Sequence, residues 1–251
     1  PQAILDEIKA EMGSRAFAAQ YQQNPVPAFG NILKRDWLIY FGPLDAAPKG
    51  GMIVQSWDTA SKPGLQNDWS VCVTAAVVGK FVYVIDVFRK RVAFPDLKAE
   101  AIRLALLYRA TVLLVEDQSS GISLVQELEK YPRQGVPVPI ARKTEGDKVS
   151  RVEGISAMVE AGQLLLPDEA PWLAELTSEL LGFPSARFDD QTDAVAHLLH
   201  WVRSRQSTSE QLVGPIVFLT HSDGSKEILG DEHGMFTRPP TGHPVRDPWG
   251  P

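Results

Sequence analysis

One unbroken apolar run, TVLLVED at residues 111–117, constrains the fold more than any other stretch of this chain. Four aliphatic residues in succession predict a strand buried on both faces, which is typical of parallel sheets covered by helices. Segments with helical spacing lie on either side of the run, at 95–109 and 119–130. We therefore expect a sheet with helices on both faces.

Three strand-like segments precede this run: MIVQSWD (52–58), WSVCVTAAVV (69–78) and FVYVIDVFRK (81–90). Gly79-Lys80 separates the last two and predicts a tight hairpin turn. After the run we expect an edge strand at 136–141 and three helices, at 147–162, 170–183 and 189–205. The predicted fold class is α/β, with a mixed five-stranded sheet flanked by helices on both faces.

The 251 residues are predicted to form three parts, and their 44% hydrophobic content supports a core of ordinary size. We expect residues 1–48 to form an N-terminal arm or linker, residues 49–205 the main domain, and residues 206–251 a partly irregular tail. Within the tail, QSTSEQ (206–211) reads as a linker and GPIVFLT (214–220) as one strand. The first residue is not methionine, which favours a fragment or a processed chain.

Composition excludes several classes of protein. The single cysteine, Cys72, leaves no internal disulfide framework and no four-cysteine zinc site. No apolar run approaches the roughly 18–20 residues that span a bilayer, and the charged N-terminus is not a signal peptide. The net charge of -6 argues against a purely electrostatic DNA clamp, although acids gathered at a metal site remain compatible with it. The chain has no phosphate-binding loop motif, no H-E-x-x-H and no G-x-S-x-G.

Several acidic residues lie at the ends of predicted strands and at the start of one predicted helix, and these positions should share one edge of the sheet. Asp58 ends the first strand, and Glu116 and Asp117 end the buried run. If these two strands are parallel neighbours, Asp58 and Glu116 leave the sheet at the same edge, which is where open α/β sheets bind ligands. Each acid alone also fits a turn, a cap or a solvated strand end.

A third group of acids, Asp189, Asp190 and Asp193, begins the last helix. Asp190 and Asp193 are three residues apart and share a helix face, so the helix would bring them to the first two acids. Converging carboxylates raise one another's pKa unless a hard cation neutralises them, and Mg²⁺ or Mn²⁺ prefers such oxygen ligands. A pair of ions would suit phosphodiester hydrolysis. The alternative is that Asp189 and Asp190 simply cap the helix.

Two further groups of polar residues, one basic and one of histidines, each allow two interpretations. Arg142, Lys143, Lys148 and Arg151 follow the edge strand, and they either contact DNA phosphates or form a solvated helix start. His197 and His200 lie three apart on the last helix among Ala196, Leu198 and Leu199; structural histidines are favoured over ligands there.

Together these segments resemble a known family. SWDTA, FVYVIDVFRKRVAFPDLK, VLLVEDQSSGISLVQEL, KVSRVEGISAMVEAGQLLLP and FDDQTDAVAH occur in that order. They are similar to the C-terminal nuclease domain of the terminase large subunit of tailed bacteriophages, which has the ribonuclease H-like fold. AFAAQYQQNPVPAFGNILKRDWLIYF resembles the end of the terminase ATPase domain, so the likeness covers roughly residues 15–203.

The resemblance implies a metal-dependent endonuclease that cuts double-stranded concatemeric viral DNA during genome packaging, with two Mg²⁺ or Mn²⁺ ions. Asp58 matches the first metal-binding acid and Glu116 the second, with Asp117 as a possible substitute. Asp193 is the preferred third acid, with Asp190 as co-ligand and Asp189 less favoured.

Implied partners are double-stranded DNA, a terminase ATPase domain or subunit, the small terminase subunit and the portal. The implied location is the host bacterial cytoplasm at the procapsid, away from membranes. Because the ATPase motif is missing, we expect an excised nuclease domain or one part of a split gene. Two alternatives remain: a Holliday-junction resolvase or ribonuclease H-type nuclease, and a catalytically silent docking module, against which the intact acids argue.

Overall fold

The computed structural model describes most of the chain and divides it into two compact units, Pro1–Ser204 and Arg205–Pro251. The described residues are 2–21, 31–60, 69–118, 120–130, 132–143, 146–212, 217–220 and 226–229. Each unit is described by itself. The expected boundary between an arm and a main domain at residues 48/49 stays a prediction.

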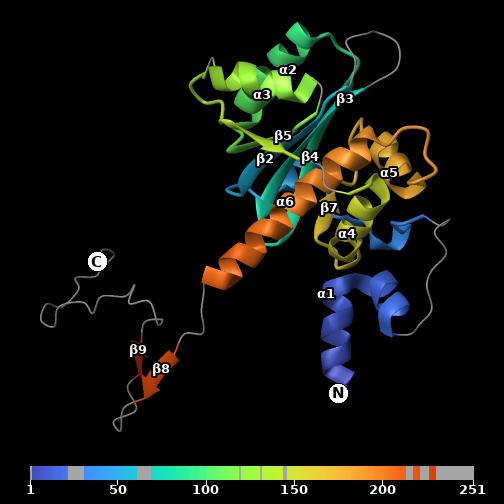
Figure 1. Ribbon diagram of the computed structural model, residues 1–251, viewed down its shortest axis with the longest axis vertical. Helices are drawn as coiled ribbons and strands as arrows, with labels where there is room; N and C mark the ends of the chain where they lie inside the picture. The colour runs from blue at the N-terminus through green and yellow to red at the C-terminus, as the bar shows by residue number, and fades with distance from the viewer. Residues whose placement is uncertain are drawn as a thin grey trace, which may run out of the picture. The chain divides into compact units, whose positions relative to one another are not determined.

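The first unit is built on a seven-stranded mixed sheet with the order β1-β7-β4-β3-β2-β5-β6 (Figure 1). The strands are β1 (Ile39–Tyr40), β2 (Met52–Asp58), β3 (Ser70–Val78), β4 (Phe81–Lys90), β5 (Val112–Glu116), β6 (Pro139–Arg142) and β7 (Leu164–Leu166). β3 runs antiparallel to β2 and β4, and every other neighbouring pair is parallel. The α/β, ribonuclease H-like expectation is confirmed, including the parallel pairing of β2 with β5.

The predicted strand count of five was too low, because β1 and β7 were not counted. They contain only two and three residues, too few to show a period of two in the sequence. β7 pairs with β4, and β1 pairs with β7, so each becomes a strand only when the rest of the sheet is present to receive it.

Six helices accompany the described strands: α1 (Gln2–Tyr21), α2 (Phe94–Tyr108), α3 (Ser120–Lys130), α4 (Lys148–Glu160), α5 (Leu173–Gly182) and α6 (Asp190–Leu212). Gly13 interrupts α1 with a φ of 80°, a backbone conformation that favours glycine. The next residue, Ser14, donates its backbone N–H to the Glu160 carboxylate of α4 at 2.7 Å. Two 3₁₀ turns, Arg35–Trp37 and Leu44–Ala46, flank β1.

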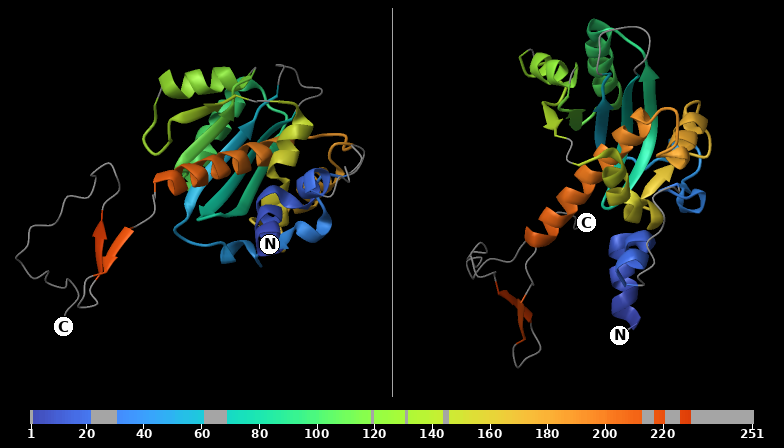
Figure 2. Two further views of the ribbon diagram at one scale, coloured as in Figure 1. Left: turned by 60° about the horizontal axis from the view of Figure 1, so that its bottom comes forward. Right: turned by 45° about the vertical axis from the view of Figure 1, so that its right-hand side comes forward.

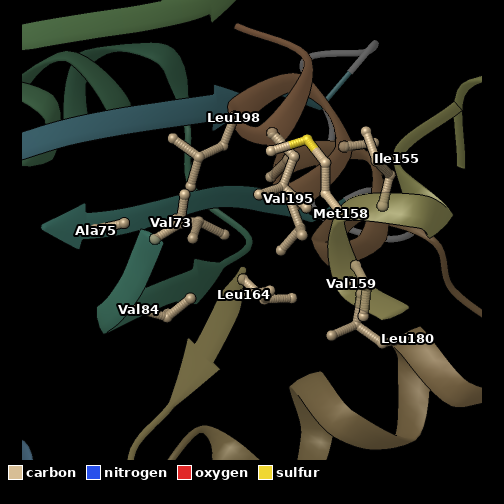
Figure 3. Packing of buried hydrophobic residues seen from close by; sticks show 14 of the residues in the cluster. Val73, Ala75, Val84, Ile155, Met158, Val159, Leu164, Leu180, Val195 and Leu198 are labelled. Atoms are coloured by element: carbon tan, nitrogen blue, oxygen red, sulfur yellow. The ribbon is translucent and has the colours of Figure 1, made fainter. Parts of the chain in front are cut away.

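Helices lie on both faces of the sheet (Figure 2). An apolar cluster fills the space between sheet and helices on each face. On one face, alternate residues of β2, β3 and β4 pack against α4, α5 and α6. Figure 3 shows part of this cluster: Val73 lies near Leu198 of α6, Val84 near Leu164 of β7, and Val195 of α6 near Met158 of α4. On the other face, the second cluster joins β2, β3, β4 and β5 to α2 and α3. Strand alternation therefore decides which helices each strand residue meets.

The second unit departs from the expected tail. The structure continues α6 through 206–211, which was predicted as a linker, because this stretch contains neither glycine nor proline to end a helix. The expected strand near 214–220 is present as β8 (Val217–Thr220), and it pairs antiparallel with β9 (Lys226–Leu229), which was not predicted. The Pro/Gly-rich residues 230–251 lie outside the described residues. Across the described part of the chain, none of the helices combines the length and apolarity required to cross a bilayer.

Candidate functional site

Two acidic residues lie side by side at the carboxyl ends of β2 and β5. Ser56 pairs with Leu114 and Trp57 with Val115, so the next register position joins Asp58 to Glu116. Trp57 and Val115 point into the α2/α3 cluster. Because side chains alternate along a strand, Asp58 and Glu116 point to the opposite face, where α6 packs.

Burial and proximity make the Asp58 carboxyl hard to ionise. Its exposed fraction is 9%. Burial raises the pKa of Asp58 well above its usual range, and a hydrogen bond to Glu116 and the charges of Glu116, Asp193 and Asp190 raise it further. A divalent cation bound to the oxygens of both carboxyls would remove this repulsion. The donor set thus fits a hard cation.

The start of α3 holds the end of β5 in place. Ser120 donates its hydroxyl to the Ala60 carbonyl at 2.6 Å, which links α3 to the segment after β2. A Cβ added at Gly121 would collide with the Glu116 carbonyl oxygen and lie 3.2 Å from the Thr59 hydroxyl. Only glycine allows this approach, so Gly121 determines how closely α3 sits behind the Asp58–Glu116 pair.

The first turn of α6 contributes Asp190 and Asp193, and a carboxylate from α5 caps it. Glu179, which is 6% exposed, accepts hydrogen bonds from the backbone N–H of Gln191 at 2.6 Å and of Thr192 at 3.2 Å. Its other oxygen accepts from the Gln191 side chain at 2.7 Å. A negative charge at a helix N-terminus is favourable. Glu179 thereby anchors the turn that carries both aspartates.

The Asp193 carboxylate is occupied by two cations from α4. Arg151 donates to one oxygen at 2.8 Å, and Lys148 approaches the other at 2.9 Å. Lys148 also contacts Asp189 at 2.8 Å. Burial lowers the pKa of Lys148, but its hydrogen bonds to Asp189 and Asp193 outweigh that and leave the pKa raised. Asp193 is thus a neutralised acid in this structure.

The third predicted acid is close enough for its charge to act on Asp58, but in this structure its own carboxylate is paired with Lys148 and Arg151. Within the residues described, no group of three or more histidine, cysteine, aspartate or glutamate side chains is already arranged around a possible metal position. Asp190 and Asp193 act on Asp58 through their charges alone. The predicted ligand set of Asp58, Glu116, Asp190 and Asp193 therefore stays a prediction.

Asp190 lies in a less balanced environment than Asp193. Burial, together with the charges of Glu179 and Asp189, raises the pKa of Asp190 to about 6, although Lys148 and Arg89 act in the opposite direction. The Asp190 carboxyl is therefore partly protonated near pH 6, and a nearby positive charge would favour its ionised form.

His197 lies one turn after Asp193, and whether it is a structural residue or a ligand stays a prediction. It is 6% exposed, and neither ring nitrogen has a hydrogen-bond partner among the described residues. Burial lowers the pKa of His197, although the charges of Glu116 and Asp193 act in the opposite direction. The i,i+4 spacing of Asp193 and His197 places both residues on one face of α6. His200 differs: its Nε2 bonds to the Arg151 carbonyl at 2.8 Å, a structural role.

The four predicted phosphate-contacting cations separate into two pairs. Lys148 and Arg151 are engaged by acids of the α6 start, as described above. Arg142 pairs in register with Glu116 across β5 and β6, and the exposed Lys143 follows it. Asp117, the possible substitute for Glu116, donates its backbone N–H to the Arg142 carbonyl at 2.8 Å. Two of the four cations, Lys143 and Lys148, are exposed. The other two, Arg142 and Arg151, are half-buried, as are Glu116 and Asp117.

A sequence family covers this site. The terminase RNaseH-like domain family matches residues 55–201, more than half of the chain, and this range includes Asp58, Glu116 and Asp193. No curated protein sequence matches the chain.

Solved structures share the architecture. The large terminase from the thermophilic bacteriophage D6E in complex with ADP aligns with a TM-score of 0.59 and 14% identity, covering 80% of this chain and 52% of that one. This chain thus spans about half the length of that protein. The large terminase nuclease from thermophilic phage G20c aligns over 69% of this chain and 98% of that one at 15% identity. Its TM-score is 0.51 with bound cobalt and 0.50 with bound magnesium. The chain belongs to the terminase RNaseH-like domain family, and its fold is that of a large-terminase nuclease domain.

Proposed function

We propose that this chain is a metal-dependent DNA endonuclease that cuts double-stranded concatemeric viral DNA during genome packaging. The observation that carries the proposal is the pairing of buried Asp58 with half-buried Glu116 at the carboxyl edge of the sheet, two carboxyls that form no ion pair with any described residue. Family membership supports a role as a packaging nuclease.

The proposed cofactor is a pair of Mg²⁺ or Mn²⁺ ions. Asp58 and Glu116 would hold them together with Asp190 and Asp193. Bound there, the ions would activate a water and neutralise the leaving oxygen of a phosphodiester. The G20c nuclease structures with bound cobalt and magnesium support the use of a divalent ion at this fold.

The chain's own residues supply orientation and charge around that centre. Lys148 and Arg151 lie beside the same acids and would stabilise negative charge that accumulates on the phosphate during hydrolysis. Arg142 and Lys143, beside Glu116 at the edge of the sheet, would position the DNA backbone. The ring nitrogens of buried His197 have no hydrogen-bond partner among the described residues, so this side chain would give the site a further hydrogen-bonding group.

The proposed partners are double-stranded DNA, a terminase ATPase domain or subunit, the small terminase subunit and the portal, acting in the host bacterial cytoplasm at the procapsid. The ATPase is supported by the D6E protein, a large terminase solved with ADP of which this chain covers about half. The proposed nuclease region is 49–205.

One observation favours a second candidate. Both oxygens of Asp193 are engaged by Lys148 and Arg151, as expected of a docking module that keeps the fold without catalysis. The nuclease proposal requires these ion pairs to open when cations bind.

Plasmid cleavage with Mg²⁺ or Mn²⁺ tests the proposal. We expect wild-type protein to nick and linearise supercoiled plasmid. Asp58→Ala should lose at least about 1000-fold in rate, equivalent to about 4 kcal/mol. Asp96→Ala, an exposed acid at the start of α2, is the matched control and should behave as wild type.

Three outcomes would change the assignment. Equal activity of wild type and Asp58→Ala would refute it. A folded but inactive wild type would favour the docking module. A preference for branched DNA or RNA–DNA hybrid over linear duplex would favour a junction resolvase or ribonuclease H-type nuclease.

A further inference from the structure

Beside the acids, arginines and aromatic rings alternate in a row. The row runs Arg91, Trp69, Arg89, Phe188, Arg187; we call these five residues the arginine–aromatic surface. The Arg91 and Arg89 guanidinium groups each lie 4.3 Å from the centre of the Trp69 ring. Arg89 lies 5.2 Å and Arg187 5.1 Å from the Phe188 ring. The two rings meet edge to face at 6.3 Å.

Sheet register relates this surface to the acid pair. Asp58 pairs with Val71, and Val71 pairs with Arg89, so the three residues form one row across β2, β3 and β4. Neighbouring strands are about 4.8 Å apart, which puts the Arg89 backbone about 10 Å from that of Asp58. Val71 and Val87 belong to the cluster beneath α6, so alternation turns Arg89 to the face that Asp58 also uses.

The charges of the surface are unequal. Arg89 is held by Glu175 at 3.0 Å and Glu179 at 3.8 Å, and its side chain is only 13% exposed. Arg91 and Arg187 are exposed and have no ion pair with any described residue. The rings constrain both guanidinium groups, whose N–H edges remain available. A hollow of about 720 Å³ opens beside Arg89, Arg187 and Phe188.

We propose that the arginine–aromatic surface binds the phosphate backbone of duplex DNA through Arg91 and Arg187 and guides it to the Asp58–Glu116 pair. Arg89 is the structural centre that orders the two rings. The chain as a whole is acidic, so two exposed arginines that are held against aromatic rings and form no ion pair with any described residue are a local exception to its charge. Planar guanidinium groups match phosphate oxygens in geometry as well as in charge. The proposal rests on the proposed function for its ligand and adds a surface distinct from Arg142, Lys143, Lys148 and Arg151.

Duplex binding by the 251-residue chain tests this surface. Fluorescence anisotropy with a labelled linear duplex in EDTA, over a series of NaCl concentrations, measures affinity without cleavage. Arg91→Gln/Arg187→Gln should bind about tenfold more weakly, and the slope of log K against log salt should fall by about 2, because each lost phosphate contact contributes about 0.9. Arg91→Lys/Arg187→Lys should restore most of that slope. Since both substituted positions are exposed, the thermal melting of these variants should match that of wild type.

Lys49→Gln/Lys80→Gln is the matched control. Both lysines are exposed, and they lie at the opposite ends of the strands, before β2 and in the β3–β4 turn. This variant loses the same charge and should keep the wild-type affinity and salt slope. A similar loss in the control and the arginine variant would mean that net charge alone matters, which overturns the proposal.

Other outcomes separate this proposal from the nuclease assignment. Unchanged duplex binding by the arginine variant refutes the surface even if the protein cuts plasmid. Arginine-dependent binding by a protein that does not cut supports the surface and refutes the nuclease. If poly-glutamate binding depends on Arg91 and Arg187 but duplex binding does not, the surface takes an acidic protein and the proposal fails.

Discussion

The Asp58–Glu116 pair and the Asp193 cluster contain the same functional group in opposite electrostatic conditions. Asp58 meets another carboxyl, which adds to the effect of burial in raising its pKa, whereas Asp193 meets Lys148 and Arg151 and is neutralised. Both aspartates are buried, so burial does not separate them. The difference is the identity of the partner. Among the described residues only the second site forms ion pairs, so the first has the greater need for a bound cation.

Removing the charge of Asp193, which pairs with Lys148 and Arg151, should have the largest effect on the stability of the protein. Asp193→Asn leaves Arg151, whose side chain is 11% exposed, without its carboxylate. Removing one partner of a buried pair typically costs 3–5 kcal/mol, and half-exposed Lys148 keeps the expected loss near 3 kcal/mol. Urea unfolding in EDTA measures it. Asp189→Asn, which removes the more exposed partner of Lys148, is the control and should cost under about 1 kcal/mol. Equal losses in the two variants would contradict the contrast.

Glu179 is a third acid to compare with Asp58 and Asp193, and its carboxylate accepts hydrogen bonds from N–H groups at the start of α6. Glu179→Gln exchanges one accepting oxygen for a donor that faces the Gln191 side-chain amide, so we expect a loss of about 2 kcal/mol. Glu175→Gln, on the same helix but 67% exposed, should change stability by less than about 0.5 kcal/mol. Chemical unfolding compares them, and hydrogen exchange in the first turn of α6 should rise in Glu179→Gln alone. Unchanged exchange there would remove the capping role.

At the cation-free pair, removing charge should stabilise the protein. Asp58→Asn abolishes the repulsion with Glu116, and we expect the melting temperature in EDTA to rise by roughly 2–4 °C, equivalent to about 1 kcal/mol. Mg²⁺ or Mn²⁺ should then raise the melting temperature of wild type and leave that of the variant unchanged, because ligand binding stabilises only the state that binds it. Destabilisation of Asp58→Asn in EDTA would show that the carboxyl is already balanced.

The smallest expected effect is the pH dependence of the metal-free protein. The folded-state pKa of Asp190 is about 6, above the ordinary value near 3.9, so the folded state binds more protons in the interval between them. Its contribution to stability is complete below about pH 4 and is lost as pH rises through 6. Asp58 acts with the same sign. Urea unfolding from pH 4.5 to 7.5 should show this decline for wild type and a shallower one for Asp190→Asn. A decline of unchanged steepness in the variant would assign the effect elsewhere.

Local pattern was sufficient for most of the fold and for part of the site. The apolar run ending at Glu116 and the alternating strands around Gly79 are short-range signals, and β2, β4 and α3 appear close to their predicted bounds. The placement of Asp58 beside Glu116 needed one further assumption, that their strands are parallel neighbours. β1 and β7 were not counted among the predicted strands, because segments of two or three residues have no measurable hydrophobic period.

The sequence by itself determined the order of the strands and helices and which acids stand at their ends, because hydrophobic periodicity and turn residues act over a few positions. Only the tertiary structure decided what each acid meets: Glu116 for Asp58, two α4 cations for Asp193, backbone N–H groups for Glu179. It also brought Trp69, Arg89 and Phe188 together from distant segments. A carboxylate's pKa and its need for a cation depend on neighbours within a few ångströms, and folding chooses those neighbours from anywhere in the chain.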